Sequence, residues 1–404
     1  MDSLFSGLQK AARIAEIRAR NAFGRQPFPS TEFAFRLFQE IKPGDRNLAI
    51  CPYSARIALA MLREGATGET RRELTQGLRL TEDSKSVANH YERLGRPLGF
   101  QLEAESRGLE MLTANSLWCD EGLTPKETYS ETLRKEYLAH IQALNFRAAE
   151  SAGVVNRWAS ENTRGRIPVV VGSLKQLAPM VLMNAVYFKG LWEKPFKSEE
   201  TKEDEFTLLD GKRKIVPMMR QSGKFQYCER GGAQIVRLPY RGGMSMSVVL
   251  PPKGMVFRKF CAELSSTVGT DWTVGMERRD GHLRLPRYQM ESSVDLSGPL
   301  RAMEMKQVFD PGLAALDGIS DRKPLFLMGV LQADFVEVNE KGTEAAAVTH
   351  LTLGSALHPA PPPPPFEMIV DRSFVFAICD DFTGTVIFLG AVVDPLESGP
   401  TKAG

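Results

Sequence analysis

The sequence is poor in cysteine and in excess charge, and both shortages narrow the classes of protein it can belong to. It has five cysteines in 404 residues, with no pair in a CxxC motif. Their wide spacing is not that of a zinc site or a disulfide framework, so we expect single buried thiols. The 51 basic and 49 acidic residues leave a net charge of +2, which gives no reason to expect a nucleic-acid or anionic membrane partner. The cysteines are Cys51, Cys119, Cys228, Cys261 and Cys379.

Long hydrophobic runs are also missing. No apolar segment approaches the length of a transmembrane helix, and residues 1–28 are charged throughout, without the apolar region of a secretory signal. The sequence also lacks an Asn-x-Ser/Thr acceptor for N-glycosylation. These absences predict a cytoplasmic protein, with export by an unrecognised route as the alternative. Residues 1–28 are predicted to be an N-terminal extension, either frayed or forming a short amphipathic helix.

Motifs of common enzymes do not occur. None of the five histidines lies in an HExxH motif, and there is no GxSxG, P-loop or GxGxxG sequence. We therefore expect a protein that is not an enzyme and that carries no cofactor and no metal.

What the sequence does contain is a helical first half followed by a second half rich in strands. In the first half, Thr124 and Glu127 of "TPKETYSETLRKEYL" have the spacing of a capping box, which predicts a helix with Thr124 as its N-cap and Pro125 as its first residue. In the second half, "SFVFAICDDFTGTVIFLGAVVDP" predicts a hairpin that turns at residues 380–384. Helices before strands, without βαβ alternation, predict the α+β class. We expect one domain over residues 29–397 and a C-terminal tail over 398–404.

One stretch, "NEKGTEAAAVTH" at residues 339–350, does not fit a surface loop. It follows a predicted strand, "ADFVEVN", yet its residues are small and barely polar. Side chains of a strand alternate between two faces, so one face would carry Thr343, Ala345, Ala347, Thr349, Leu351 and Leu353. Small residues allow a segment to slide between two strands that are already paired, and Gly342 gives the backbone freedom to turn. The pattern predicts a segment that is an exposed loop in one state and a central strand in another.

In this respect the sequence resembles the serpin family. The resemblance runs from about Phe33 to Pro395 and includes five segments in the family's order: "NLAICPYSARIALAMLREGATGET", "MVLMNAVYFKGLWEKPF", "FDPGLAALDGIS", "FVEVNEKGTEAAA" and "FLGAVVDP". It implies a fold of three β-sheets and about nine helices, with an exposed reactive-centre loop at about residues 341–366. Insertion of such a loop into a β-sheet is a known form of strand addition, and it releases strain stored in the fold before insertion. The resemblance also implies a monomer that can polymerise on heating.

The resemblance assigns roles within the loop. The hinge, which enters the sheet first, is implied to be Gly342, Thr343, Glu344, Ala345, Ala346 and Ala347. Counting from Glu340 by the family's spacing places the bond cut by a protease at Ala356–Leu357. Leu353 and Leu357 are alternatives for the residue before the cut. A proline-rich run at residues 359–365 follows and is predicted to form an extended polyproline II spacer.

Two further groups of residues are implied to control insertion. A latch where the new strand would enter comprises Trp192, Arg287 and Glu340, and the family usually has lysine at the position of Arg287. A polar cluster in the middle of the sheet comprises Cys51, Ser54, Asn184 and Gln332. The family often has serine at the position of Cys51 and histidine at that of Gln332. Because a thiol is a weak hydrogen-bonding group, we expect a weaker cluster here.

The small hinge residues favour inhibition over other serpin activities. The resemblance then implies a suicide inhibitor of elastase-, subtilisin- or chymotrypsin-like serine proteases, whose covalent complex is the expected partner interaction. The alternatives are a non-inhibitory serpin that acts as a binding or chaperone protein, and an inhibitor of papain-like cysteine proteases. No Arg or Lys lies between Lys341 and Arg372, so trypsin-like proteases are expected to be poor targets.

Overall fold

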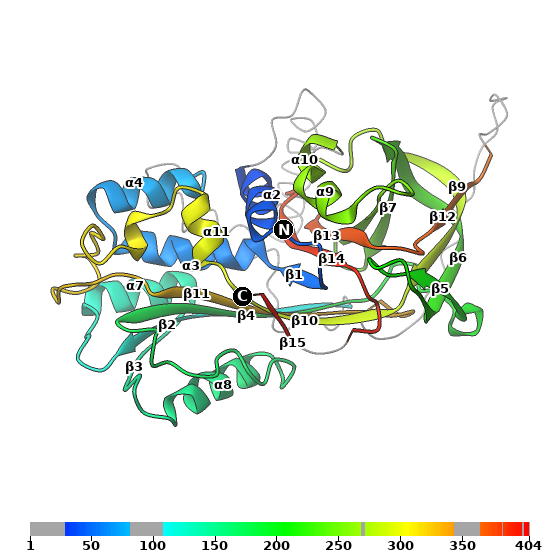
Figure 1. Cartoon of the computed structure of the whole chain (residues 1–404). Helices are drawn as coiled ribbons and strands as arrows, with labels where there is room; N and C mark the ends of the chain where they lie inside the picture. Colours follow the sequence, from blue (N-terminus) through cyan, green and yellow to red (C-terminus); the bar gives the residue numbers. More distant parts are fainter. Residues whose placement is uncertain are drawn as a thin grey trace, which may run out of the picture.

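The computed structural model describes residues 29–80, 108–267, 271–342, 364–381, 383–397 and 400–403 (Figure 1). The hinge residues 343–347 and the bond at 356–357 therefore lie outside the described residues, as do Leu353 and the N-terminal extension. The described helices are α2 (Pro29–Ile41), α3 (Pro52–Glu64), α4 (Gly68–Gly77), α7 (Glu127–Tyr137), α8 (Ser151–Asn162), α9 (Phe257–Ala262), α10 (Leu264–Thr267), α11 (Ser297–Ala302), and the 3-10 turns η1 (Ser198–Glu200) and η2 (Gln307–Phe309). No helix in these ranges is both long enough and apolar enough to cross a bilayer.

A six-stranded sheet forms the centre of the molecule. Its order is β15-β10-β11-β4-β2-β3, and the β11–β4, β2–β3 and β10–β15 pairs are parallel. Its strands are β2 (Leu109–Asp120), β3 (His140–Leu144), β4 (Met180–Gly190), β10 (Tyr288–Asp295), β11 (Gly329–Val338) and β15 (Pro400–Ala403). The predicted C-terminal tail thus includes a short strand that pairs with the outer edge of β10.

The remaining described strands form one nine-stranded sheet, where two separate sheets were expected. Their hydrogen bonding is continuous because β6 is 18 residues long and pairs with β5 near its start, β9 in its middle and β7 at its end. The predicted hairpin at the C-terminal end is confirmed by the antiparallel pairing of β13 and β14. The order is β1-β14-β13-β8-β7-β6-β9-β12 with β5 beside β6, and the bounds are β1 (Leu48–Ile50), β5 (Lys202–Thr207), β6 (Arg213–Arg230), β7 (Ala233–Tyr240), β8 (Met244–Leu250), β9 (Glu277–Pro286), β12 (Phe366–Ile369), β13 (Phe374–Asp380) and β14 (Val386–Val392).

The six-stranded sheet is covered on both faces (Figure 1). On one face, Ala333 and Phe335 of β11 belong to a core cluster that includes residues of α8. On the other face, Val330 and Val336 belong to the main core, together with residues of α2 and α3. Because strand residues alternate, the even-numbered side chains of β11 all point into this main core. The polar residues at positions 332 and 334 are therefore placed inside the protein.

Two local expectations are wrong. Helix α7 begins at Glu127 with Lys126 as its N-cap, so the capping box at Thr124 does not form. The Lys126 backbone N–H donates to the Ile319 oxygen at 2.7 Å, and this tertiary contact fixes where the helix starts. All five thiols are free, but Cys228 and Cys379 are only partly buried.

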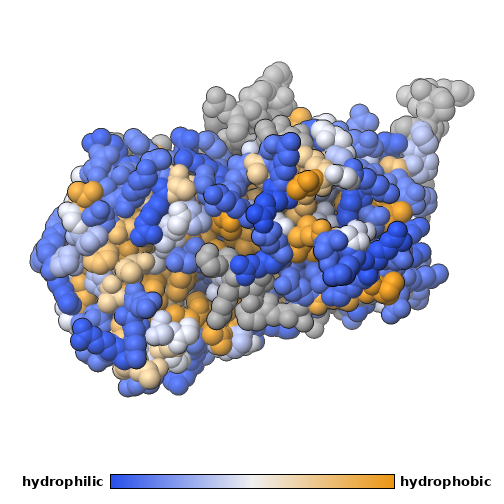
Figure 2. All heavy atoms as spheres, viewed as in Figure 1, coloured by the Kyte–Doolittle hydropathy of each residue, from blue (hydrophilic) through white to orange (hydrophobic). Residues whose placement is uncertain are grey.

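The surface shows polar side chains over most of the face in Figure 2, with hydrophobic atoms in separate bands between them. The most exposed large hydrophobic side chains of the described residues include Leu138, after α7, and Val256, before α9. Single exposed hydrophobic residues on different elements are ordinary and do not define a binding surface.

Candidate functional site

The seam between β4 and β11 is closed. These two strands pair directly in parallel, from Gly329 opposite Val181 to Val336 opposite Phe188. No other strand lies between them along this register. The two strands are therefore adjacent with no inserted strand between them, and the seam is a parallel ladder, the slightly less stable type of strand pair.

The chain turns back immediately after β11. Asn339 and Gly342 exchange two backbone hydrogen bonds of 3.0 and 3.1 Å, and Gly342 also forms a bridge with Leu191. Gly342 has a φ of +103°. A Cβ atom there would lie 2.3 Å from the Gly190 oxygen and 2.5 Å from the Trp192 nitrogen. This position therefore requires glycine both for its backbone conformation and for space.

We expect Gly342→Ala to destabilise this turn more than a positive φ alone would. The φ strain costs about 1–2 kcal/mol, and the contacts with backbone atoms, which cannot move away as a side chain can, add to it. The matched control is Gly211→Ala, because Gly211 has a φ of +82° with nothing within 4 Å of the added Cβ. Urea unfolding of both variants measures the difference. Equal losses of stability would mean that the turn at Gly342 yields to accommodate the methyl group.

The structure brings the three latch residues together. Glu340 is almost fully buried, with 6% of its side chain exposed, and forms an ion pair and hydrogen bond with Arg287, whose side chain is 48% exposed. Thr201 also donates its hydroxyl to Glu340 Oε1 at 2.7 Å, a contact that the sequence gave no signal for. The Glu340 carbonyl oxygen accepts from Phe196 N–H at 2.8 Å. Glu340 is thus held through both its side-chain carboxylate and its backbone carbonyl.

Trp192 holds the same turn from the other side. Its indole Nε1–H donates to the Asn339 oxygen at 2.9 Å, and its backbone N–H donates to the Lys341 oxygen at 3.2 Å. The ring stacks on Tyr240, with centroids 4.2 Å apart and planes 10° apart. The stacked ring fixes the position of the indole donor, so the end of β11 is tied to the end of β4.

The charge of Glu340 depends on these partners. Burial alone would raise the pKa of its carboxyl, but the hydrogen bonds from Arg287 and Thr201 outweigh burial, and the net pKa is lowered. Because the pKa is lowered on folding, the ionised Glu340 carboxyl stabilises the folded form at pH values above about 4.3, the ordinary pKa of glutamate. This contribution is lost as the pH falls through the lowered pKa.

Two members of the polar cluster, Cys51 and Gln332, are joined by hydrogen bonds between the Gln332 side chain and the Cys51 backbone. Gln332 accepts from Cys51 N–H at 3.1 Å and donates through Nε2 to the Cys51 oxygen at 3.0 Å. The Cys51 thiol is used differently: it accepts from Ser54 N–H at 3.4 Å and caps α3. The contacts between Cys51 and Gln332 use the Cys51 backbone and do not involve its sulfur.

The other two members meet at a residue that the sequence analysis missed. Asn115, on β2, accepts from the Ser54 hydroxyl at 3.2 Å and from Asn184 Nδ2 at 2.5 Å through the same oxygen. All three are buried. The polar cluster therefore links α3, β2 and β4. The sequence gave no distinct signal for Asn115, because β2 contains several other polar residues.

The far end of the segment that follows the turn is anchored on the nine-stranded sheet. Phe366 begins β12 and stacks on Tyr227, with centroids 3.8 Å apart. A Cβ on Gly281 would lie 2.2 Å from the Phe366 ring, so this glycine makes room for it. Arg279 donates to the Pro364 oxygen through Nε and Nη2 at 3.2 and 2.9 Å. Residues 343–363 are thus bounded by two firmly held ends.

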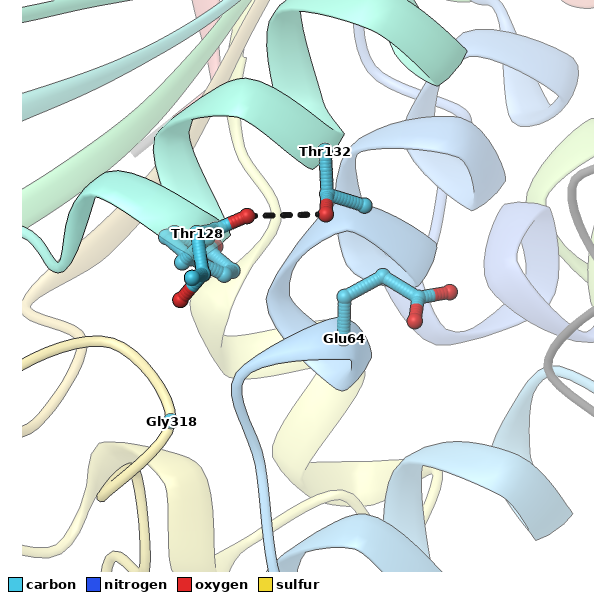
Figure 3. A pocket seen from close by; sticks show the side chains of 5 residues that line it. Glu64, Thr128, Thr132 and Gly318 are labelled. Carbon is cyan, nitrogen blue, oxygen red and sulfur yellow. Dashed lines mark hydrogen bonds between the residues drawn. The ribbon is translucent and has the colours of Figure 1, made fainter.

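A separate hollow of about 260 Å³ lies where the end of α3 meets α7 (Figure 3). It is lined by Glu64, Thr128, Tyr129, Thr132 and Gly318. The Glu64 carboxylate accepts from the Tyr137 hydroxyl at 2.8 Å. None of the latch or polar-cluster residues lines this hollow, so it is distinct from the strand seam.

Comparison with known proteins gives one consistent family. A family model described as Serpin (serine protease inhibitor) matches residues 29–395. A serpin-like protein of Thermococcus kodakarensis is 33% identical over 368 residues, covering 90% of this chain and 84% of that protein. Plasminogen activator inhibitor 1 of Neovison vison is 30% identical and covers 97% of both chains.

Solved structures agree on the fold. The thermophilic serpin tengpin in its native state aligns with a TM-score of 0.80 and 24% identity, covering 92% of this chain and 96% of tengpin. The thyroxine-binding globulin complex with thyroxine aligns with a TM-score of 0.78 and 24% identity, covering 91% and 99%. At this identity the likeness concerns the arrangement of helices and strands only.

Proposed function

The chain belongs to the serpin family, and we propose that it is a suicide inhibitor of serine proteases that works by inserting its cleaved loop between β4 and β11. The observation that carries this proposal is the turn at Asn339–Gly342. It directs the chain back antiparallel to β11, beside a seam that holds no other strand. An inserted strand would replace one parallel ladder with two antiparallel ladders, and antiparallel pairing is slightly more stable per residue.

The register of the turn supports the alternating-face interpretation. A strand that continued the Asn339–Gly342 pairing along β11 would place Thr343 opposite Val338 and Thr349 opposite Gln332. Residues opposite each other in a ladder share a face. Val338 and Gln332 are both fully buried, so Thr343, Ala345, Ala347 and Thr349 would enter the main core. Small side chains at these positions suit such a path.

The proposed reaction begins as ordinary proteolysis. The serine of the protease attacks the carbonyl of Ala356, Leu357 leaves as the new amino terminus, and an acyl-enzyme remains on the hinge side of the loop. Insertion then carries the attached protease along and distorts its active site before water can release it. The unexpanded sheet is held by a barrier rather than by greater stability, a case of kinetic stability.

The test is a panel of purified proteases of the elastase, subtilisin, chymotrypsin and papain classes. We expect a covalent complex that survives boiling in detergent with an elastase- or subtilisin-type enzyme, and a released peptide whose mass places the cut at Ala356–Leu357. A cut after Leu353 or Leu357 would shift the proposed targets to chymotrypsin- or papain-like proteases. Clean cleavage without a complex across the panel would contradict inhibition and support the binding or chaperone alternative.

A further inference from the structure

One carboxyl group of the central sheet is buried without a partner. Asp334, in β11, is 0% exposed. Neither of its carboxyl oxygens has a hydrogen-bond partner among the described residues. An isolated ionised carboxylate in such a place is strongly unfavourable, and the group responds by binding a proton.

The groups around Asp334 do not offset this burial. Ser292 of β10 lies directly opposite in the ladder, and its hydroxyl oxygen accepts from Ala49 N–H of β1 at 2.9 Å. No hydrogen bond joins this hydroxyl to either carboxyl oxygen of Asp334. On the β4 side the opposite residue is Val186. The titratable neighbour is Cys51 before α3. Burial raises the pKa of its thiol, and an ionised Asp334 would raise it further, so the thiol is neutral and supplies no positive charge. No cation of the described residues contacts Asp334.

The same surroundings set the proton affinity of Asp334. Burial raises the pKa of its carboxyl well above the ordinary value, and the nearby Cys51 backbone amide offsets only part of that rise. Two residues away on the same face, Gln332 lies opposite Asn184, whose amide oxygen is also buried without a partner. Three buried polar atoms without a partner, two on Asp334 and one on Asn184, thus lie on the two strands of the β4–β11 seam.

We propose that Asp334 is a proton-dependent switch of this seam: the neutral carboxyl keeps β4 and β11 together, and loss of its proton favours their separation. Separation admits water to the carboxyl and satisfies it, whereas the closed seam cannot. This holds whether or not the chain inhibits a protease, because it concerns the unexpanded sheet alone.

The direction of the pH effect follows from linkage. The closed seam binds the proton more tightly than a hydrated form, in which the aspartate has its ordinary pKa of about 3.9. Between that value and the raised pKa, the equilibrium constant for opening rises by about tenfold per pH unit. Acid therefore stabilises the closed seam, and alkali weakens it. The Glu340 latch titrates below its ordinary value, so measurements above pH 5.5 separate the two groups.

Hydrogen exchange of wild type and Asp334→Asn tests the switch. Asparagine has the same shape but cannot ionise. At pH 8 we expect peptides from β4 and β11 to exchange faster in the wild type than in the variant. This ratio of rates should shrink by up to about tenfold per pH unit toward pH 5.5. Comparison at equal pH removes the intrinsic pH dependence of exchange.

Two controls locate the effect. Peptides of the β13–β14 hairpin should exchange equally in both proteins, and Glu131→Gln, which removes an exposed carboxyl on α7, should leave the seam unchanged at every pH. A wild-type-to-variant ratio that does not depend on pH, or a less protected seam in the variant at pH 8, would overturn the proposal.

The wild type alone provides a second measurement if Asp334→Asn does not fold. Isotope-edited infrared spectra of protein labelled with ¹³C-aspartate should show a protonated aspartate carboxyl at pH 7 that disappears on unfolding. Its absence from the folded protein at pH 7 would also rule the switch out.

Discussion

Under the proposed mechanism, Thr343→Arg is expected to turn this chain from an inhibitor into a substrate. Thr343 is the first residue that would enter the core, opposite the fully buried Val338. Burying an unpaired polar or charged group costs at least about 2 kcal/mol. If this whole cost is added to the activation free energy of insertion, the insertion rate falls by more than tenfold. Deacylation then precedes insertion, and the protease is released active. Residual protease activity and the loss of the detergent-stable complex are the measurements.

The matched control is Glu344→Arg. In the same register residue 344 would lie opposite Glu337, which is partly exposed, so an arginine there would reach solvent beside a carboxylate. We expect this variant to retain most of the inhibition. The cleaved Thr343→Arg protein should also gain less thermal stability than the cleaved wild type. Equal inhibition by both variants, or equal failure, would show that the faces of "GTEAAAVTHLTL" are assigned wrongly.

Glu340→Lys should open the β4–β11 seam at the end next to the Asn339–Gly342 turn and promote polymerisation on mild heating. The substitution places a cation beside Arg287 and removes the acceptor used by Thr201. Removal of one partner of a buried ion pair costs about 3–5 kcal/mol. Because the Arg287 side chain is half exposed, we expect the lower end of that range or less. Native gels after stepwise heating should show polymer at a lower temperature than for the wild type.

Charge reversal separates the loss of the ion pair from a general disturbance of the turn. The double variant Glu340→Lys with Arg287→Glu restores opposite charges and should recover part of the lost resistance to heating. Glu340→Gln keeps an acceptor for Thr201 without the charge and should lie between wild type and Glu340→Lys. If the double variant polymerises as readily as Glu340→Lys, the ion pair is not what holds this end of the seam.

The sequence by itself determined the family, the α+β class and the hinge pattern. The resemblance to serpins and the expected fold are confirmed, and local signals were sufficient wherever the structure is local. The β13–β14 hairpin follows from two apolar runs around a turn, and the glycine at position 342 follows from a change of chain direction next to a strand. In both cases the cause lies within a few residues along the chain.

Tertiary structure decided the rest. The capping box at Thr124 did not form because Lys126 donates to Ile319, a residue remote in sequence. The shared acceptor Asn115 was not predictable from its own strand, because its role depends on a helix and another strand that meet there. Asp334 looks like an ordinary acidic residue in the sequence. It becomes a buried carboxyl without a partner only because an even position of β11 points into the core, where the cost of a charge is set by the surrounding elements.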